Sequence, residues 1–224
     1  MRTLTWVSMG RYKTAQPPLE LSMNLMASFL LLLFMSLQAP VALAGSESGP
    51  SSVAKGVLLV ASPSLNDPNF HQTVVLILEH GPQGTVGLVL NRATNMLLSE
   101  VLPGVSSLKG TTHRLFAGGP VQPNVVLLLT RLKEPQPDMR SVFDSVYIGG
   151  TPEVLERIIR QAAPADRFRA FAGYAGWASG QLASEMLQGA WAMLPAENDL
   201  FDQDPAMIWQ NSIARLQAPR VICH

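Results

Sequence analysis

The chain has 224 residues, with 16 Lys and Arg balanced by 16 Asp and Glu, and 47% of its residues are hydrophobic. A domain of this size buries a sizeable core, and a neutral chain without any Lys/Arg run is a poor candidate for broad binding to a nucleic-acid backbone. The single cysteine, Cys223, excludes an internal disulfide framework and a thiolate metal cluster.

The first 44 residues differ in composition from the rest. Met26 to Leu37 (MASFLLLLFMSL) is an apolar run as long as the core of an export signal, and Ala42-Leu43-Ala44 before Gly45 fits a cleavage site. The run is shorter than the ~20 apolar residues of a membrane span, so no stable span is expected after cleavage. Residues 1–44 therefore predict a periplasmic or secreted protein. The alternative is a cytoplasmic protein that starts at a residue such as Met23.

The remaining chain predicts a simple organisation. Residues 45–54 are polar and rich in Ser and Gly, which favours a flexible linker. Residues 55–218 are expected to form one domain, and residues 219–224 a short tail.

The first part of this domain has the strongest strand signals. Val57 to Ala61 predicts a strand that ends at Ser62-Pro63. Thr73 to Glu79 and Thr85 to Leu90 predict a hairpin whose strands are joined by a five-residue loop. These runs are apolar almost throughout, so we expect both faces of their sheet to be covered.

The rest of the domain is predicted to contain both helices and strands. Capping residues indicate helices from Asn95 to Leu102, from Thr151-Pro152 to Ala162, and from Asp204-Pro205 to Leu216. A further helix should bury Leu182, Met186 and Ala190. Strands are expected at residues 114–117, 125–130, 142–148 and 167–172, an exposed excursion at 133–138, and a glycine-rich loop at 173–180.

Several motifs carry a family resemblance. They are LLVASPSLNDPNF at 58–70, TVVLILEH at 73–80, GTVGLVLNR at 84–92, GGPV at 118–121, and GYAGWASGQL at 173–182 followed by Glu185 and Trp191. In this order the chain resembles the AlgH/YqgE-like family of bacterial proteins. The resemblance implies an α+β fold: a single compact domain with a mixed β-sheet that includes a small barrel-like part, surrounded by helices. It implies no reaction, although some members are labelled as regulators of transcription.

The chain departs from the family pattern at three places. After GGPV, an Arg-Gly-Phe type continuation ending in histidine is expected, whereas this chain has Gln122-Pro123-Asn124-Val125 and ends the strand at Thr130. Gln72 stands where a basic residue is usual, and Ala183 where Glu is usual. No site that depends on that histidine, base or carboxylate is carried over.

The sequence predicts no catalytic residue, no metal site and no cofactor. Glu79 and His80 are neighbours on a strand, so their side chains should point to opposite faces. Ser179 comes one place too late for a nucleophile elbow, and the histidines lack metal-ligand spacing. These observations favour a protein that is not an enzyme.

The glycine-rich loop is the first candidate site. A strand that enters such a loop before a helix leaves free amides where an anion can bind. Tyr174 and Trp177 would form a stacking wall, and Gln181 would select the ligand. The alternative is that the glycines only permit positive φ and the aromatic residues pack as core. The predicted ligand-binding set is Gly173, Tyr174, Gly176, Trp177, Gly180 and Gln181.

The second candidate is an interaction surface. Arg92, at the end of a buried strand, is expected to contact an anion or a partner, whereas Asp67 has the alternative role of holding its turn. The predicted set is Pro63, Asp67, Pro68, Phe70, Glu79, His80, Asn91 and Arg92.

Together these patterns predict a non-enzymatic regulatory or interaction protein that acts through an unknown protein partner or a small ligand. One alternative is a small-molecule protein, either an anionic-ligand binder or an enzyme, that uses the loop at 173–181. The other is a transcriptional regulator, although direct binding to nucleic acid is the least favoured by the charge balance.

Overall fold

A computed structural model describes residues 5–6, 52–133, 138–161 and 168–218. Apart from Thr5 and Trp6, the predicted leader at 1–44 lies outside the described residues, as do most of the linker and the tail at 219–224. No helix among the described residues is both long and apolar enough to cross a membrane.

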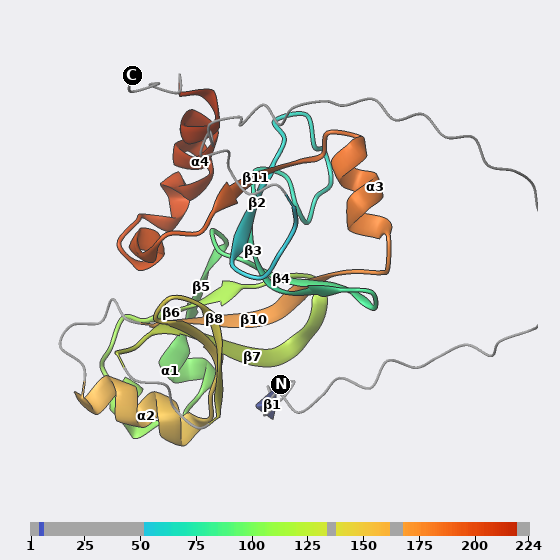
Figure 1. The fold of residues 1–224 in the computed structure, drawn as a ribbon. Helices are drawn as coiled ribbons and strands as arrows, with labels where there is room; N and C mark the ends of the chain where they lie inside the picture. The colour runs from blue at the N-terminus through green and yellow to red at the C-terminus, as the bar shows by residue number, and fades with distance from the viewer. Residues whose placement is uncertain (1–4, 7–51, 134–137, 162–167, 219–224) are drawn as a thin grey trace, which may run out of the picture.

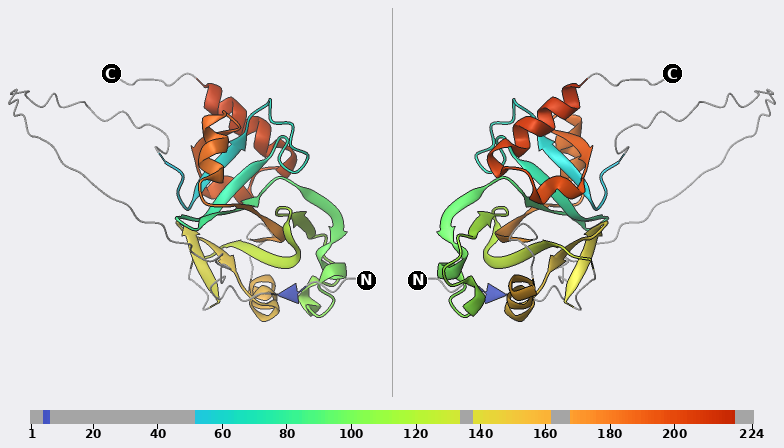
Figure 2. Two further views of the ribbon diagram at one scale, coloured as in Figure 1. Left: turned by 90° about the vertical axis from the view of Figure 1, so that its right-hand side faces the viewer. Right: turned by 90° about the vertical axis from the view of Figure 1, so that its left-hand side faces the viewer.

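One curled sheet organises the domain (Figure 1). Its main path runs β11-β2-β3-β4-β10-β7-β9-β8, and every neighbouring pair on that path is antiparallel. β6 pairs in parallel with β10, so the sheet is mixed. The views in Figure 2 show it wrapping into a half-barrel. The predicted α+β fold is thereby confirmed. The strands are β1 (Thr5–Trp6), β2 (Val57–Ala61), β3 (Val74–Gly81), β4 (Gly84–Val89), β5 (Ala93–Leu97), β6 (Arg114–Ala117), β7 (Val121–Arg131), β8 (Met139–Phe143), β9 (Val146–Gly149), β10 (Phe168–Trp177) and β11 (Trp191–Pro195).

Short helices cover the two ends of the sheet. α3 and α4 lie beside the β11-β2 end, and α1 and α2 lie at the opposite end (Figure 1). The helices are α1 (Leu98–Val101), α2 (Pro152–Gln161), α3 (Gln181–Leu187) and α4 (Ile208–Gln217), with 3-10 turns η1 (Ser106–Leu108), η3 (Asn198–Phe201) and η4 (Pro205–Met207).

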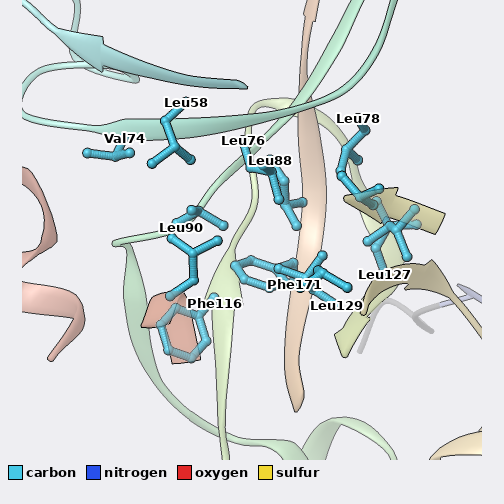
Figure 3. Close-up of a cluster of buried hydrophobic side chains, with 14 of the residues drawn as sticks. Leu58, Val74, Leu76, Leu78, Leu88, Leu90, Phe116, Leu127, Leu129 and Phe171 are labelled. Atoms are coloured by element: carbon cyan, nitrogen blue, oxygen red, sulfur yellow. The ribbon is translucent and has the colours of Figure 1, made fainter. Parts of the chain in front are cut away.

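The main core lies inside the curl of the sheet. Side chains from β2, β3, β4, β6, β7 and β10 meet there (Figure 3). Leu76, Leu127 and Phe171 are at most 1% exposed. The intervening residues of these strands, such as Val75 and Leu128, point to the outer face and belong to two further buried clusters. Both faces of these strands are therefore covered, as their continuous apolar runs predict.

Strand β10 is the centre of the sheet. Its residues Ala170 to Ala172 pair with β6 on one edge and with β7 on the other, and Ala175 to Trp177 pair with β4. Gly118 links β4 to β10, because its N–H donates to the carbonyl of Ala172 and its own carbonyl accepts from the amide of Val89, both at 2.8 Å. β6 and β4 thus follow one another along β10.

Glycines make this junction possible. A Cβ on Gly119 would lie 2.2 Å from the carbonyl carbon of Tyr174, and a Cβ on Gly118 would lie 2.3 Å from the carbonyl oxygen of Gly173. Gly173 has φ +69° and sits at a bulge in β10. The GGPV and GYAGW motifs, far apart in sequence, are therefore two sides of one backbone contact.

The predicted hairpin is confirmed, but its loop is shorter than expected. Gly81 pairs with Gly84, which leaves only Pro82 and Gln83 in the turn instead of residues 80–84. The ladder continues to the glycines because they allow a two-residue turn.

Two predicted elements in the middle of the chain are wrong. Residues 93–97 form strand β5 before the short helix α1, because Ala93 and Leu97 pair with β6 and the Thr94 hydroxyl donates to the carbonyl of Leu115 at 2.7 Å. Residues 142–148 are not one strand: β8 and β9 form a hairpin whose turn places Asp144 at φ +38°, a conformation that Asp tolerates.

The region of the predicted glycine-rich loop also differs. β10 continues to Trp177, so the loop shrinks to residues 178–180. The following helix ends at Leu187, before Gly189 at φ +73°. Ala190 therefore leads into β11, a strand that the sequence analysis did not predict.

The two clearest predicted helices are present. The Thr151 hydroxyl accepts from the amide of Val154 at 3.3 Å at the start of α2, and the Asp204 carboxylate accepts from the amide of Ala206 at 3.0 Å before α4. α4 buries Ile208, whereas Leu216, the last residue of the predicted helix, is 37% exposed.

The close backbone contact generates a stability prediction. Gly119→Ala forces a Cβ into the backbone of β10 at φ +151°, and we expect it to lower the free energy of unfolding by about 3 kcal/mol or more. Gly104→Ala is the matched control because a Cβ there meets nothing within 4 Å. Urea unfolding of the two variants measures the difference. Equal stability would contradict the proposed contact.

Candidate functional site

A cavity of about 250 Å³ lies where β6 and β10 begin. Because these strands run parallel, with Leu115 opposite Ala170, their first residues meet at one edge of the sheet. The 3-10 turn η3 closes another side through Phe201. The lining residues are Thr112, His113, Arg114, Phe116, Phe168, Arg169, Ala170 and Phe201.

Arg169 is the most unusual residue of this cavity, because its charged side chain is partly buried. Its guanidinium lies 5.4 Å from the ring centre of Phe116. Its Nη2 donates to the carbonyl of Gln203 at 2.8 Å and more weakly to that of Phe201 at 3.5 Å. Burial lowers the pKa of Arg169, and the negative charges of Asp202 and Asp204 partly offset this lowering.

The nearest carboxylates are not direct partners of Arg169. Asp202 forms a two-pronged contact with Arg131, at 3.0 and 3.2 Å, and hydrogen bonds from Arg131 lower the pKa of Asp202. The ion pairs found among the described residues do not include Arg169. Its positive charge is therefore balanced only at longer range.

Three phenylalanine residues also border the cavity. Phe116, Phe168 and Phe201 are each at most 8% exposed. The His113 ring lies 4.7 Å from the ring of Phe168. Arg114 is exposed at the rim.

Phe168 and Arg169 are neighbours on β10, so their side chains point to opposite faces of the sheet, and Phe168 packs in an outer cluster whereas Phe116 and Phe201 belong to the main core. The site thus places one partly buried and one exposed cation beside a hollow, an arrangement that can hold a small anion.

The residues of the predicted glycine-rich loop belong to a different region. Trp177 is only 4% exposed, and its Nε1 donates to Glu185 Oε2 at 2.9 Å. Trp191 Nε1 donates to the same oxygen at 2.8 Å, and Gln181 Nε2 donates to Glu185 Oε1 at 3.0 Å. Gln181 also accepts from the amide of Ala178 at 3.0 Å. These polar groups are occupied within the protein.

The same region contains an aromatic cluster. Phe70 stacks on Trp177 with ring centres 5.7 Å apart and meets Trp191 edge-on at 5.6 Å. Tyr174 packs beside the main core on the opposite side of β10, and burial raises its pKa. Tyr174 and Trp177 therefore do not form one wall. Gly173 lies at the bulge of β10, Gly176 is exposed, and Gly180 precedes α3 at φ +75°.

Part of the predicted interaction surface is brought together by hydrogen bonds. Asn91 Oδ1 accepts from the amide of Val74 at 3.0 Å, and Asn91 Nδ2 donates to the carbonyl of Gln72 at 2.9 Å. Arg92 donates to the carbonyl of His71. These bonds fix the loop that follows Pro63, Asp67 and Pro68, where Asp67 Oδ1 accepts from the amide of Asn69 at 2.7 Å.

Glu79 and His80 lie at the other end of β3. Glu79 pairs with Arg140 of β8, and His80 Nδ1 is 2.8 Å from the Thr85 hydroxyl. The structure does not bring them to the loop at 63–70, so the predicted surface divides into two places.

The cavity was not predicted from the sequence. The alternation of charged and apolar residues predicts a strand with Arg167 and Arg169 on a solvent-exposed face, but Arg167 lies outside the described residues and Arg169 is partly buried. The sequence feature closest to the cavity is the alternation Arg-Phe-Arg-Ala at 167–170. That pattern does not reveal that β6 and η3 fold over the arginine, because both contacts are distant in sequence.

Comparison with known proteins places the chain among related sequences. A family model described as AlgH-like matches residues 58–220. A UPF0301 protein from Anaeromyxobacter sp. (strain K) is 35% identical, covering 76% of this chain and 91% of the relative. A UPF0301 protein from Thioalkalivibrio sulfidiphilus is 37% identical, covering 70% and 87%.

Two solved structures have the same fold. The solution structure of the AlgH protein from Pseudomonas aeruginosa aligns with a TM-score of 0.63 at 30% identity, covering 78% of this chain and 94% of that protein. A crystal structure from Corynebacterium diphtheriae aligns with a TM-score of 0.59 at 25% identity, covering 80% and 92%.

The Glu185 network generates a second stability prediction. Glu185→Ala leaves two indole N–H groups without their acceptor, and we expect it to cost about 2–3 kcal/mol of unfolding free energy. Gln188→Ala, an exposed change on the residue that follows the same helix, should cost less than about 0.5 kcal/mol. Denaturant unfolding followed by tryptophan fluorescence compares them. A neutral Glu185→Ala would mean that the network does not stabilise the fold.

Proposed function

The chain belongs to the AlgH-like family, and from this membership and the geometry of the cavity we propose that it is a non-enzymatic regulatory or interaction protein controlled by a small anionic ligand. The resemblance indicated by the sequence motifs is confirmed. The ligand-binding role, the unknown protein partner and the compartment are parts of the proposal.

The observation that carries the proposal is the position of Arg169. Burying a charged group is costly unless an opposite charge or hydrogen bonds compensate it. Two carbonyl oxygens, the ring of Phe116 and the more distant charges of Asp202 and Asp204 provide part of this compensation. An anion in the adjoining cavity would provide the rest, and Arg114 at the rim would help to attract it.

The lining favours binding over catalysis. The described lining residues include no carboxylate and no cysteine, and Thr112 supplies the one hydroxyl group among them. His113 is the one lining side chain suited to general acid–base chemistry, and its ring lies against Phe168. A binding function requires only the cation and a hollow beside it.

The contacts of Arg169 suggest how ligand binding in the cavity would change the surface that a protein partner contacts. Its guanidinium holds the carbonyl of Gln203. Gln203 follows η3 and its C-cap residue Asp202, and both Asp199 of η3 and Asp202 are exposed. A ligand that displaces the carbonyl of Gln203 from the guanidinium would loosen residues 198–204. A ligand that binds both the guanidinium and residues 198–204 would hold this segment more firmly. Either change alters an exposed acidic surface that a protein partner can contact.

Arg169→Gln tests the proposal. Acetate, inorganic phosphate and benzoate are titrated separately into the full chain, and amide shifts are recorded by two-dimensional NMR. At least one anion should shift residues 112–116 and 168–170 in the wild type, with binding at least ~10-fold weaker in Arg169→Gln. Arg215→Gln is the control, because this α4 residue carries the same charge and does not line the cavity. Shifts that persist in Arg169→Gln would contradict the proposal.

We also propose export as the route by which the domain reaches its compartment. The support is the apolar run at 26–37 followed by Ala42-Leu43-Ala44. The intact mass of the protein isolated from its own cell should correspond to a chain that begins at Gly45. A cytoplasmic chain that keeps the apolar run, or begins at Met23, would contradict export and leave the ligand proposal intact.

A further inference from the structure

We infer that the edge of strand β7 that faces away from β10, called here the second edge of β7, is the docking site for an extended segment of a protein partner. The segment joins the sheet as a parallel strand beside Val126. The inference rests on the proposed role as an interaction protein, and it adds a binding surface and the form of the partner. Three observations support it: the pairing of β7, the position of β1 and the sequence around β1.

The two edges of β7 are paired to different extents. Along its first edge β7 pairs with β10, from Val121 to Thr130. On the second edge, the described strand β9 pairs with Leu129 to Arg131. Gly149 and Gly150 follow, both with positive φ, where the chain leaves β7 and continues to α2. The second edge before Leu129 is therefore left for another strand.

The backbone groups of Val126 face this second edge. Hydrogen-bonding directions alternate along a strand. The amide of Leu132 donates to the carbonyl of Ser145, just before β9, at 2.9 Å, and Thr130 pairs with Tyr147 of β9. The even-numbered residues in this part of β7 thus point to the second edge. The side chain of Val126 is buried in an outer cluster, so a partner meets this residue through its main chain.

Strand β1 demonstrates that the second edge accepts a strand. Thr5 lies opposite Val125 and Trp6 lies opposite Val126, in parallel (Figure 1). Both residues come from the predicted leader, far from β7 in sequence. A sheet edge takes up an extended chain readily because its N–H and C=O groups require partners. Within the full chain, β1 occupies the place that we assign to the partner.

Removal of the leader would free this place. Cleavage after Ala44, as proposed above, separates β1 from the domain. The N–H and C=O groups of Val126 then lose the neighbouring strand, and the second edge becomes available. The leader therefore blocks the docking site in the uncleaved chain, and the processed protein is the form that binds the partner.

The partner segment should be short, extended and rich in strand-forming residues. Gln122, with φ +48°, and Pro123, which lacks an N–H, interrupt the edge on one side. β9 limits it on the other side at Leu129. The strand seated there comes from residues 3–7 (TLTWV), whose β-branched, aromatic and aliphatic side chains favour strands and carry no charge. A protein with an uncharged segment of this kind fits the site.

The first experiment uses a synthetic peptide of residues 2–8 (RTLTWVS) as the probe. It is titrated into full-length Thr5→Pro, in which the proline disfavours pairing of β1. We expect the peptide to shift the amides of residues 125–128 in two-dimensional NMR spectra. It should bind the wild-type full chain at least ~10-fold more weakly, because the chain's own β1 competes for the edge.

Full-length Thr5→Val is the matched control. Valine keeps the backbone N–H and the strand preference of this position, so peptide binding should be as weak as to the wild type. Thr5 lies outside the domain at 55–218, so the amide spectrum of the core should be the same in both variants. Equally tight peptide binding by Thr5→Pro, Thr5→Val and the wild type would contradict the competition with β1.

A second peptide tests whether the main chain carries the binding. It has proline in place of Thr5 and should bind full-length Thr5→Pro at least ~10-fold more weakly than the first peptide. Equal binding of the two peptides would overturn strand addition.

Two further outcomes would overturn the inference. One is the absence of shifts at residues 125–128 with the first peptide. The other is dimerisation of full-length Thr5→Pro in size-exclusion chromatography, with concentration-dependent shifts at residues 125–128, which would assign the edge to a second copy of the chain. Neither outcome affects anion binding, which is measured at residues 112–116 and through Arg169→Gln, so the two proposals fail separately.

Discussion

The close backbone contact between Gly118-Gly119 and strand β10 is the constraint on which the rest of the structure depends. A side chain at Gly119 would overlap the backbone of Tyr174 and Ala175. The contact lets β6 and β4 share one edge of β10 in succession, and the sheet curls there. The cavity lies at the start of β10 and the Trp177–Glu185 network at its end. One strand, bent at Gly173, therefore positions both regions.

This constraint changes the meaning of the family motifs. The GGPV and GYAGW motifs meet each other at the backbone contact, and Gln181, Glu185 and Trp191 join Trp177 in one hydrogen-bond network. Similarly, Asn91 and Arg92 secure the loop after Asp67. The most recognisable residues are accounted for by folding. Arg169, which lines the cavity, lies outside these motifs.

Features that depend on neighbouring residues could be predicted from the sequence, whereas features that depend on contacts between distant parts of the chain could not. The strands at 57–61 and 73–90 and the helix that begins at Pro152 follow from local apolar patterns and caps, and the structure contains them. β5 and β11 exist because distant strands offer pairing edges, so local propensity misses them. The burial of Arg169 has the same origin: its contacts with Phe116 and Gln203 join three separate parts of the chain.

The position of Thr130 connects the family pattern to the cavity. It ends the run in which the resemblance implies a histidine, and here it is fully buried, with its hydroxyl 3.6 Å from the sulfur of Met139. Thr130 pairs across the sheet with Phe168, which lines the cavity. A histidine at this place would bring a larger, polar and titratable ring beside that wall. A chain with a histidine at this place would therefore differ from this one on the side of β10 where Phe168 packs.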